Sequence, residues 1–123
     1  MPLNEDQLDE FRGLLTADKE RLLEKAVHTL KNEIELSKDD MADEADLASA
    51  LTDQSLSLRL RGRERTLIEK IDLALKRIEA GEFGTCIVCE DDIEVDRLRA
   101  RPVTTMCIAC KEEQERRERQ FLS

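Results

Sequence analysis

Two long stretches of the chain repeat apolar side chains at steps of three and four residues, the spacing of one helical face. The first stretch, within residues 1–38, contains no proline after Pro2, and Asn4 with Gln7 forms an N-terminal capping-box pattern. The second stretch, residues 45–80, is followed by Gly81, a residue typical of helix C-termini. The apolar positions are Leu8, Phe11, Leu15, Leu22, Ala26, Leu30 and Ile34, and then Ala48, Leu56, Leu60, Leu67, Ile71, Ala74 and Ile78.

The short segment between the two stretches, residues 39–46, is acidic and predicts a turn. Two long helices joined by a short turn are expected to pack as an antiparallel coiled-coil hairpin. Helical periodicity stops in residues 82–110, where β-like pieces at 93–95 and 102–104 predict a small ribbon. Residues 111–123 return to helix-forming composition and predict a short C-terminal helix. The fold class is therefore mainly α with a small cysteine-containing module.

Composition supports thin apolar seams and not a thick globular core, because charged residues make up 40% of the chain and aromatic residues 2%. The net charge is −9, and it is concentrated in the first half of the chain. An acidic chain is repelled by nucleic-acid phosphates, which disfavours autonomous DNA binding. No basic region followed by an apolar run begins the chain, and no stretch is apolar enough to span a membrane. A cytoplasmic, monomeric protein is expected.

The four cysteines form two C-x-x-C pairs, Cys86 with Cys89 and Cys107 with Cys110, separated by 17 residues. Thiols stay reduced in the cytoplasm, so disulfides do not explain them. This spacing is typical of a four-cysteine zinc finger, in which four thiolates fill the tetrahedral coordination of one structural Zn²⁺. The alternatives are iron in a rubredoxin-like site and a redox dithiol pair. The latter fits less well, since two paired motifs suit a metal better than one exchanging pair.

Two charged clusters are candidate binding sites, although each also has a simple structural explanation. The turn carries five acids in eight residues, and Asp43 and Asp46 could merely cap the second helix. A negative tip on a rigid hairpin could alternatively enter a basic or magnesium-containing cavity. The basic residues of the second helix and the cysteine module, which could be merely solvated or could bind phosphate, are Arg59, Arg61, Arg63, Arg65, Lys70, Arg101 and Lys111.

A series of short motifs runs from the first helix to the last cysteine. They are Asn4-Glu5 with Gln7-Leu8 and Phe11-Arg12, Asp43-x-x-Asp46-x-Ala48, Ser57-Leu58-x-Leu60-Arg61 with Arg63-x-Arg65 and Leu67-Ile68, Phe83-Gly84-x-Cys86-x-x-Cys89, Arg97-Leu98-x-Ala100-Arg101-Pro102, and Cys107-Ile108-x-Cys110-Lys111. In this order and spacing they resemble the DksA/TraR family of bacterial transcription regulators over nearly the whole chain. One departure is Glu90, which stands where the family's zinc knuckles often have glycine.

The resemblance implies a regulator that binds RNA polymerase directly, has no sequence-specific DNA binding of its own and is not an enzyme. It implies that the coiled coil enters the polymerase's secondary channel. There the tip residues Asp43 and Asp46, with Ala48 beside them, would act near the active site and modulate promoter complexes. Ribosomal RNA promoters would be repressed and some amino-acid promoters activated, as in the stringent response.

The resemblance also implies an effector, the alarmone ppGpp, bound at the interface between the regulator and the polymerase. The family positions for ppGpp fall on Leu67, Lys70, Arg101 and Lys111, and Arg63 falls at a position that helps to hold the polymerase. Two other functions remain as alternatives. One is a transcript-cleavage factor that acts from the secondary channel, and the other is a zinc ribbon protein that binds nucleic acid, against which the net charge and the scarce aromatic residues argue.

Overall fold

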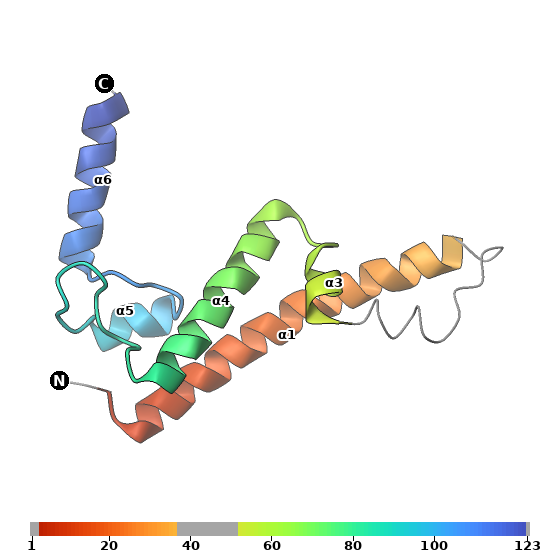
Figure 1. The fold of residues 1–123 in the computed structure, drawn as a ribbon, viewed down its shortest axis with the longest axis horizontal. Coiled ribbons are helices and arrows are strands. Elements are labelled where there is room, and N and C mark those ends of the chain that lie inside the picture. Colours follow the sequence, from red (N-terminus) through yellow and green to blue (C-terminus); the bar gives the residue numbers. More distant parts are fainter. Residues whose placement is uncertain (1–2, 37–51, 123) are drawn as a thin grey trace. The chain divides into compact units, whose positions relative to one another are not determined.

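The chain is mainly helical in the computed structural model, which describes residues 3–36 and 52–122 (Figure 1). The helices in these residues are α1 (Glu5–Leu36), α3 (Asp53–Ser57), α4 (Gly62–Ala80), α5 (Val95–Ala100) and α6 (Ile108–Leu122). The chain divides into two compact units, which we call the first unit (Met1–Leu15 and Leu73–Ser123) and the second unit (Thr16–Asp72). Helices α1 and α4 each contribute residues to both units.

The start of α1 is fixed by the capping box that the sequence predicts. The Gln7 amide donates to Asn4 Oδ1 at 2.8 Å, and the Asn4 amide donates to Gln7 Oε1 at 3.1 Å. These two bonds satisfy backbone donors that have no partner within the first turn of a helix. The prediction that this helix begins after Asn4 is confirmed, and its predicted last residues, 37 and 38, lie outside the described residues.

The second unit pairs α1 with α3 and α4 in antiparallel directions. The ion pairs Lys19–Asp72, Lys25–Glu64 and Arg59–Glu33 connect later residues of α1 to earlier residues of the partner segment. Apolar side chains are buried along the same seam, which confirms the predicted pairing of two helical stripes. The buried residues of this unit are Leu22, Ala26, Leu30, Leu56, Leu60, Ile68 and Ile71.

The prediction of one continuous helix over residues 45–80 is wrong in the part that the structure describes. Helix α3 ends at Ser57, and α4 begins only at Gly62. The Arg65 guanidinium bonds carbonyls of this segment. Its Nε donates to the Ser57 carbonyl at 3.4 Å, and its Nη2 donates to the carbonyls of Leu58 and Leu60 at 3.1 and 3.4 Å. One position of the predicted stripe also differs, since Ile68 is buried in the seam and the predicted Leu67 is only half-buried.

The first unit has a small apolar core built around two phenylalanine rings. Phe11 of α1 is completely buried, and its ring centroid lies 5.4 Å from that of Phe83, just after α4. Leu98 of α5 is also completely buried. The other buried apolar residues of this unit are Leu15, Ala74, Ile78 and Ile93.

The predicted β-ribbon is wrong, because the described residues hold only one isolated bridge, between Thr85 and Asp92. Val95, placed in a strand by its β-branched side chain, begins helix α5, which Leu98 anchors in the core. Residues 102–104 form a turn, in which the Thr104 amide donates to the Arg101 carbonyl at 3.1 Å. Without a partner strand, a short segment with helix-forming Arg, Leu and Ala packs as a helix.

The predicted C-terminal helix is present as α6, but it begins earlier than expected, inside the second C-x-x-C motif. The Lys111 amide donates to the Cys107 carbonyl at 3.0 Å, so that Cys110 already lies in the first turn. No helix among residues 3–36 and 52–122 combines the length and the apolar character that crossing a membrane would need.

Candidate metal centre

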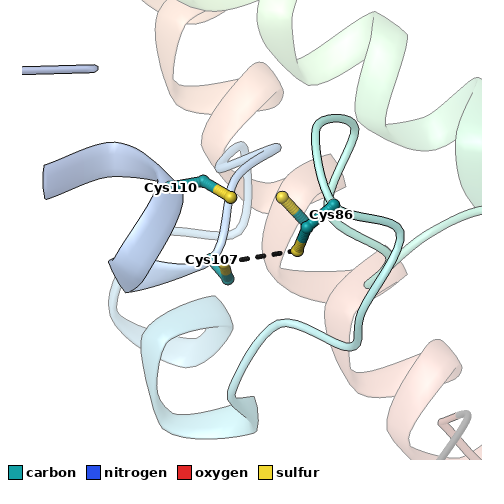
Figure 2. Close-up of side chains that lie close together, drawn as sticks. Cys86, Cys107 and Cys110 are labelled. Carbon is teal, nitrogen blue, oxygen red and sulfur yellow. Dashed lines mark hydrogen bonds between the residues drawn. The ribbon is translucent and has the colours of Figure 1, made fainter. Parts of the chain in front are cut away.

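The two C-x-x-C motifs converge within the first unit. The four Sγ atoms of Cys86, Cys89, Cys107 and Cys110 all lie within 4.8 Å of one another, and those of Cys89 and Cys107 are 3.7 Å apart. Figure 2 shows Cys86, Cys107 and Cys110 turned toward a common centre. A tetrahedral zinc ion with Zn–S bonds of about 2.3 Å would separate its sulfurs by roughly 3.8 Å. The donor set and its spacing therefore fit one Zn²⁺ held entirely by protein thiolates.

Backbone hydrogen bonds shape the first knuckle, residues 84–91. The Cys86 amide donates to the Asp91 carbonyl at 2.8 Å, and the Glu90 amide donates to the Cys86 carbonyl at 3.0 Å. Gly84 has a φ of +88°, and a Cβ atom there would lie 3.0 Å from a methyl carbon of Leu3. Glycine is therefore required at this position for both its backbone conformation and its close contact.

The protonation of the cysteines also fits a cation. Burial opposes ionisation of Cys86, but backbone N–H groups of Cys89, Cys107 and Val88 outweigh it and lower the pKa to about 6. The neighbouring Cys107 sulfur is the main cause that raises the pKa of Cys110 to about 12, with burial next. Crowded thiolates repel one another, so all four can be ionised at neutral pH only when a cation compensates them.

Glu90 closes the first knuckle in a conformation that favours glycine. Its φ is +65°, and it is the one non-glycine residue with positive φ in the described part of the chain. A side chain in this left-handed region costs about 1–2 kcal/mol. Glu90 thus adopts the backbone conformation that glycine favours, at the expense of local strain.

Glu90→Gly is expected to raise the free energy of unfolding of the zinc-loaded protein by up to about 1 kcal/mol, because the strain relieved exceeds the added flexibility of the unfolded chain. Urea denaturation monitored by circular dichroism measures this change. Glu90→Ala is the matched control, since it removes the exposed carboxylate but keeps the Cβ atom, and it should leave the stability unchanged. An equal gain in both variants would assign the effect to charge and not to backbone strain.

The other predicted site residues fall in three groups. The tip residues Asp43, Asp46 and Ala48 lie outside the described residues. Arg63, Leu67 and Lys70 lie on α4 in the second unit, where Arg63 and Lys70 are exposed and Leu67 is half-buried. Arg101 and Lys111 belong to the first unit, the former exposed after α5 and the latter half-buried in α6.

Two arginines of the first unit were not singled out from the sequence, although both reach the cysteine loops. Arg77 Nη2 donates to the Thr85 carbonyl at 2.7 Å, and Arg97 Nε donates to the Met106 carbonyl at 3.0 Å. The sequence gives only a weak signal that these two arginines contact the cysteine loops. Arg77 lies in the last turn of a helix four residues before Gly81, and Arg97 belongs to one of the family motifs.

The fold and the site together define a helical protein that carries a four-cysteine zinc finger. Comparison with family models agrees with this class. The model for the N-terminal domain of the DnaK suppressor protein DksA matches residues 7–78, and the model for the prokaryotic dksA/traR C4-type zinc finger matches residues 81–116. The chain therefore belongs to the DksA/TraR family.

Individual relatives resemble the chain along most of its length. The RNA polymerase-binding transcription factor DksA of Caulobacter vibrioides is 43% identical over 95% of this chain and 82% of its own length. The protein of the same name from Escherichia coli is 40% identical over 97% of this chain and 78% of its own. Both names describe transcription factors and not enzymes.

Solved structures give the same result for the fold. The transcription factor DksA2 from Pseudomonas aeruginosa is 40% identical, with a TM-score of 0.69 over 94% of this chain and 88% of that one. The RNA polymerase binding protein and transcriptional regulator Dks from Chlamydia trachomatis is 26% identical, with a TM-score of 0.57 over 99% of both chains.

Proposed function

We propose that this protein binds RNA polymerase directly and regulates transcription from the secondary channel, together with ppGpp. The observation that carries the proposal is the 43% identity, over 95% of the chain, to a protein named as an RNA polymerase-binding transcription factor. Binding and not catalysis is the proposed activity, because a zinc ion with four protein thiolates has no position for water or substrate. The metal acts by holding the module folded.

The proposed contact with the active site lies in the acidic segment between the two helical stripes. Asp43 and Asp46 are separated by one helical turn in sequence, and Ala48 follows them. The antiparallel ion pairs of the second unit support a hairpin whose turn falls in this segment. A negative tip on such a hairpin suits a basic or magnesium-containing cavity.

Arg63 is the proposed polymerase contact on α4. Of the four alternating arginines, Arg59 pairs with Glu33 at 3.1 Å, and Arg65 bonds three backbone carbonyls. Those two side chains are therefore used inside the fold. Arg61 and Arg63 are exposed, which leaves them accessible to a partner.

The residues proposed to contact ppGpp are Leu67 and Lys70 of α4, Arg101 after α5 and Lys111 of α6. Guanidinium and ammonium groups are the side chains that recognise phosphate, and the guanidinium can do so with two parallel hydrogen bonds. Lys70 and Arg101 are exposed, as a shared interface with a second protein requires. The polymerase would supply the remainder of the site.

Transcription in vitro from a ribosomal RNA promoter, with and without ppGpp, tests the proposal. The wild-type protein should repress this promoter, and Asp46→Asn should lose repression while its binding to polymerase, measured separately, is retained. Asp39→Asn removes the same charge from the same acidic segment and should still repress. Loss of polymerase binding in Asp46→Asn would mean that Asp46 only caps a helix.

The effector is tested in the same assay with alanine at Lys70, Arg101 and Lys111 together. This variant should keep the repression seen without ppGpp and lose the additional response to it. An unchanged response would reject this site for the effector. A cleavage assay on backtracked complexes and a binding assay on bare DNA should both be negative, and a positive result would favour one of the alternative functions.

A further inference from the structure

Each half of the cysteine cluster is connected to an arginine in the same way. Arg77 of α4 donates through Nη2 to the Thr85 carbonyl at 2.7 Å and to the Glu82 carbonyl at 2.9 Å. Arg97 of α5 donates through Nε to the Met106 carbonyl at 3.0 Å. Thr85 and Met106 occupy equivalent places, because each directly precedes the first cysteine of a C-x-x-C motif.

These bonds fix the peptide planes that lead into the two cysteines. The Thr85–Cys86 peptide is held on both sides, since its carbonyl accepts from Arg77 and its N–H donates to the Asp91 carbonyl at 2.8 Å. The Met106 carbonyl accepts from Arg97 and, at 3.5 Å, from the Thr104 hydroxyl. A fixed peptide plane limits the directions in which the next side chain can point. The arginines therefore restrict where the sulfurs of Cys86 and Cys107 lie.

The tethered cysteines are the buried members of their pairs. Cys86 and Cys107 are 0% and 7% exposed, whereas Cys89 is exposed and Cys110 half-buried. Both guanidinium groups contact the peptide before a buried ligand, through the Thr85 and Met106 carbonyls, and not the sulfur itself.

Helix capping alone does not explain the arrangement. The end of α4 is already closed by the backbone, since the Arg77 carbonyl accepts from the amides of Glu82 and Phe83 at 2.9 and 3.1 Å, and Gly81 has a φ of +75°. The Arg77 side chain reaches beyond this turn to Thr85. Arg97 lies on a different helix and reaches the other knuckle. The feature shared by the two side chains is that each bonds the carbonyl directly before a cysteine of the cluster.

We propose that Arg77 and Arg97 are positioning residues for the zinc centre, each of which orients one buried cysteine ligand through the peptide before it. Groups that orient the ligands of a metal typically change its affinity by about 10–100-fold when they are removed. Loss of either arginine should weaken zinc binding by that factor, while the four thiolate ligands themselves remain.

The test compares Arg77→Met and Arg97→Met in the full chain, since methionine keeps much of the side-chain volume and removes the donors. Competition with a chelator of known affinity measures the dissociation constant for Zn²⁺, and we expect a rise of about 10–100-fold in each variant. Arg99→Met is the matched control. Arg99 lies on the same helix as Arg97 but pairs with Glu10 at 2.9 Å, so its loss should not change zinc affinity.

Two further measurements separate positioning from general loss of structure. Charge-transfer absorption of the Co²⁺-substituted protein should weaken or shift in both variants and be unchanged in Arg99→Met. Amide hydrogen exchange should accelerate locally, at Cys86 and Glu90 in Arg77→Met and at Lys111 in Arg97→Met. Partial recovery is expected in Arg97→Lys, which can still donate one bond.

Zinc affinity in both variants equal to that of the wild type or of Arg99→Met would overturn the proposal. So would exchange that rises evenly across the first unit, because the arginines would then contribute only to overall stability. None of these readouts involves polymerase, so the result does not depend on the proposed function.

Discussion

Replacing Cys107 with serine is expected to unfold residues 82–110 while much of the α1–α4 helical pairing persists. Structural zinc in small fingers contributes about 10–16 kcal/mol of binding free energy, so weakening the site by removing one thiolate ligand removes a main source of the module's stability. The module has little else to hold it, since the buried apolar residues between its ends are Phe83, Ile93 and Leu98. Ion pairs and the apolar seam of the second unit involve no cysteine.

Far-ultraviolet circular dichroism should therefore show a partial loss of helix, and amide exchange should show lost protection confined to the cysteine loops, α5 and the start of α6. Ile108→Ser is the matched control, because it places serine beside Cys107 at a residue that is 45% exposed and binds no metal. It should leave zinc binding intact. A metal-free protein in which residues 82–110 remain folded, or one that loses all helix, would contradict the modular role of the metal.

The parts of the fold that follow from local periodicity could be predicted from the sequence. The capping box of Asn4 and Gln7 forms as expected, and Phe11, Leu15 and Leu22 of the first stripe are all buried. The cysteine cluster was equally predictable, because its chemistry depends on residue type and spacing and hardly on the surrounding fold. The acidic tip stays a prediction, since it lies outside the described residues.

The two wrong predictions are the continuous second helix and the β-ribbon. Both concern segments where side-chain contacts, and not only local backbone preference, bear on the conformation. The residues between Ser57 and Gly62 have no strong preference against a helix. The break there is accompanied by hydrogen bonds from Arg65 to carbonyls up to eight positions earlier. Apolar periodicity does not report such a contact. It also did not separate the adjacent Leu67 and Ile68, of which Ile68 is the buried one. Similarly, the β-branched Val95 suggested a strand, but burial of Leu98 in the same segment favours α5.

Phe11→Ala is expected to cost about 3–5 kcal/mol of unfolding free energy, the usual range for removing a fully buried aromatic side chain. Phe11 is 0% exposed, and its ring packs at 46° against that of Phe83. The chain has three phenylalanines and no tyrosine or tryptophan, so the two rings supply most of the aromatic packing available to it. A loss of this size is a large fraction of the roughly 5–15 kcal/mol that stabilises an ordinary domain.

The third phenylalanine provides the control for this measurement. Phe121, near the end of α6, is 91% exposed, and Phe121→Ala should change stability by no more than about 0.5 kcal/mol. Urea denaturation of the zinc-saturated proteins compares the two. A double-mutant cycle with Phe83→Ala should give a coupling of about 0.5–1.5 kcal/mol beyond the buried area. Since Phe83 lies three residues before Cys86, this coupling would connect the first turns of α1 to the zinc module. Equal costs for Phe11→Ala and Phe121→Ala would show that the module is not anchored there.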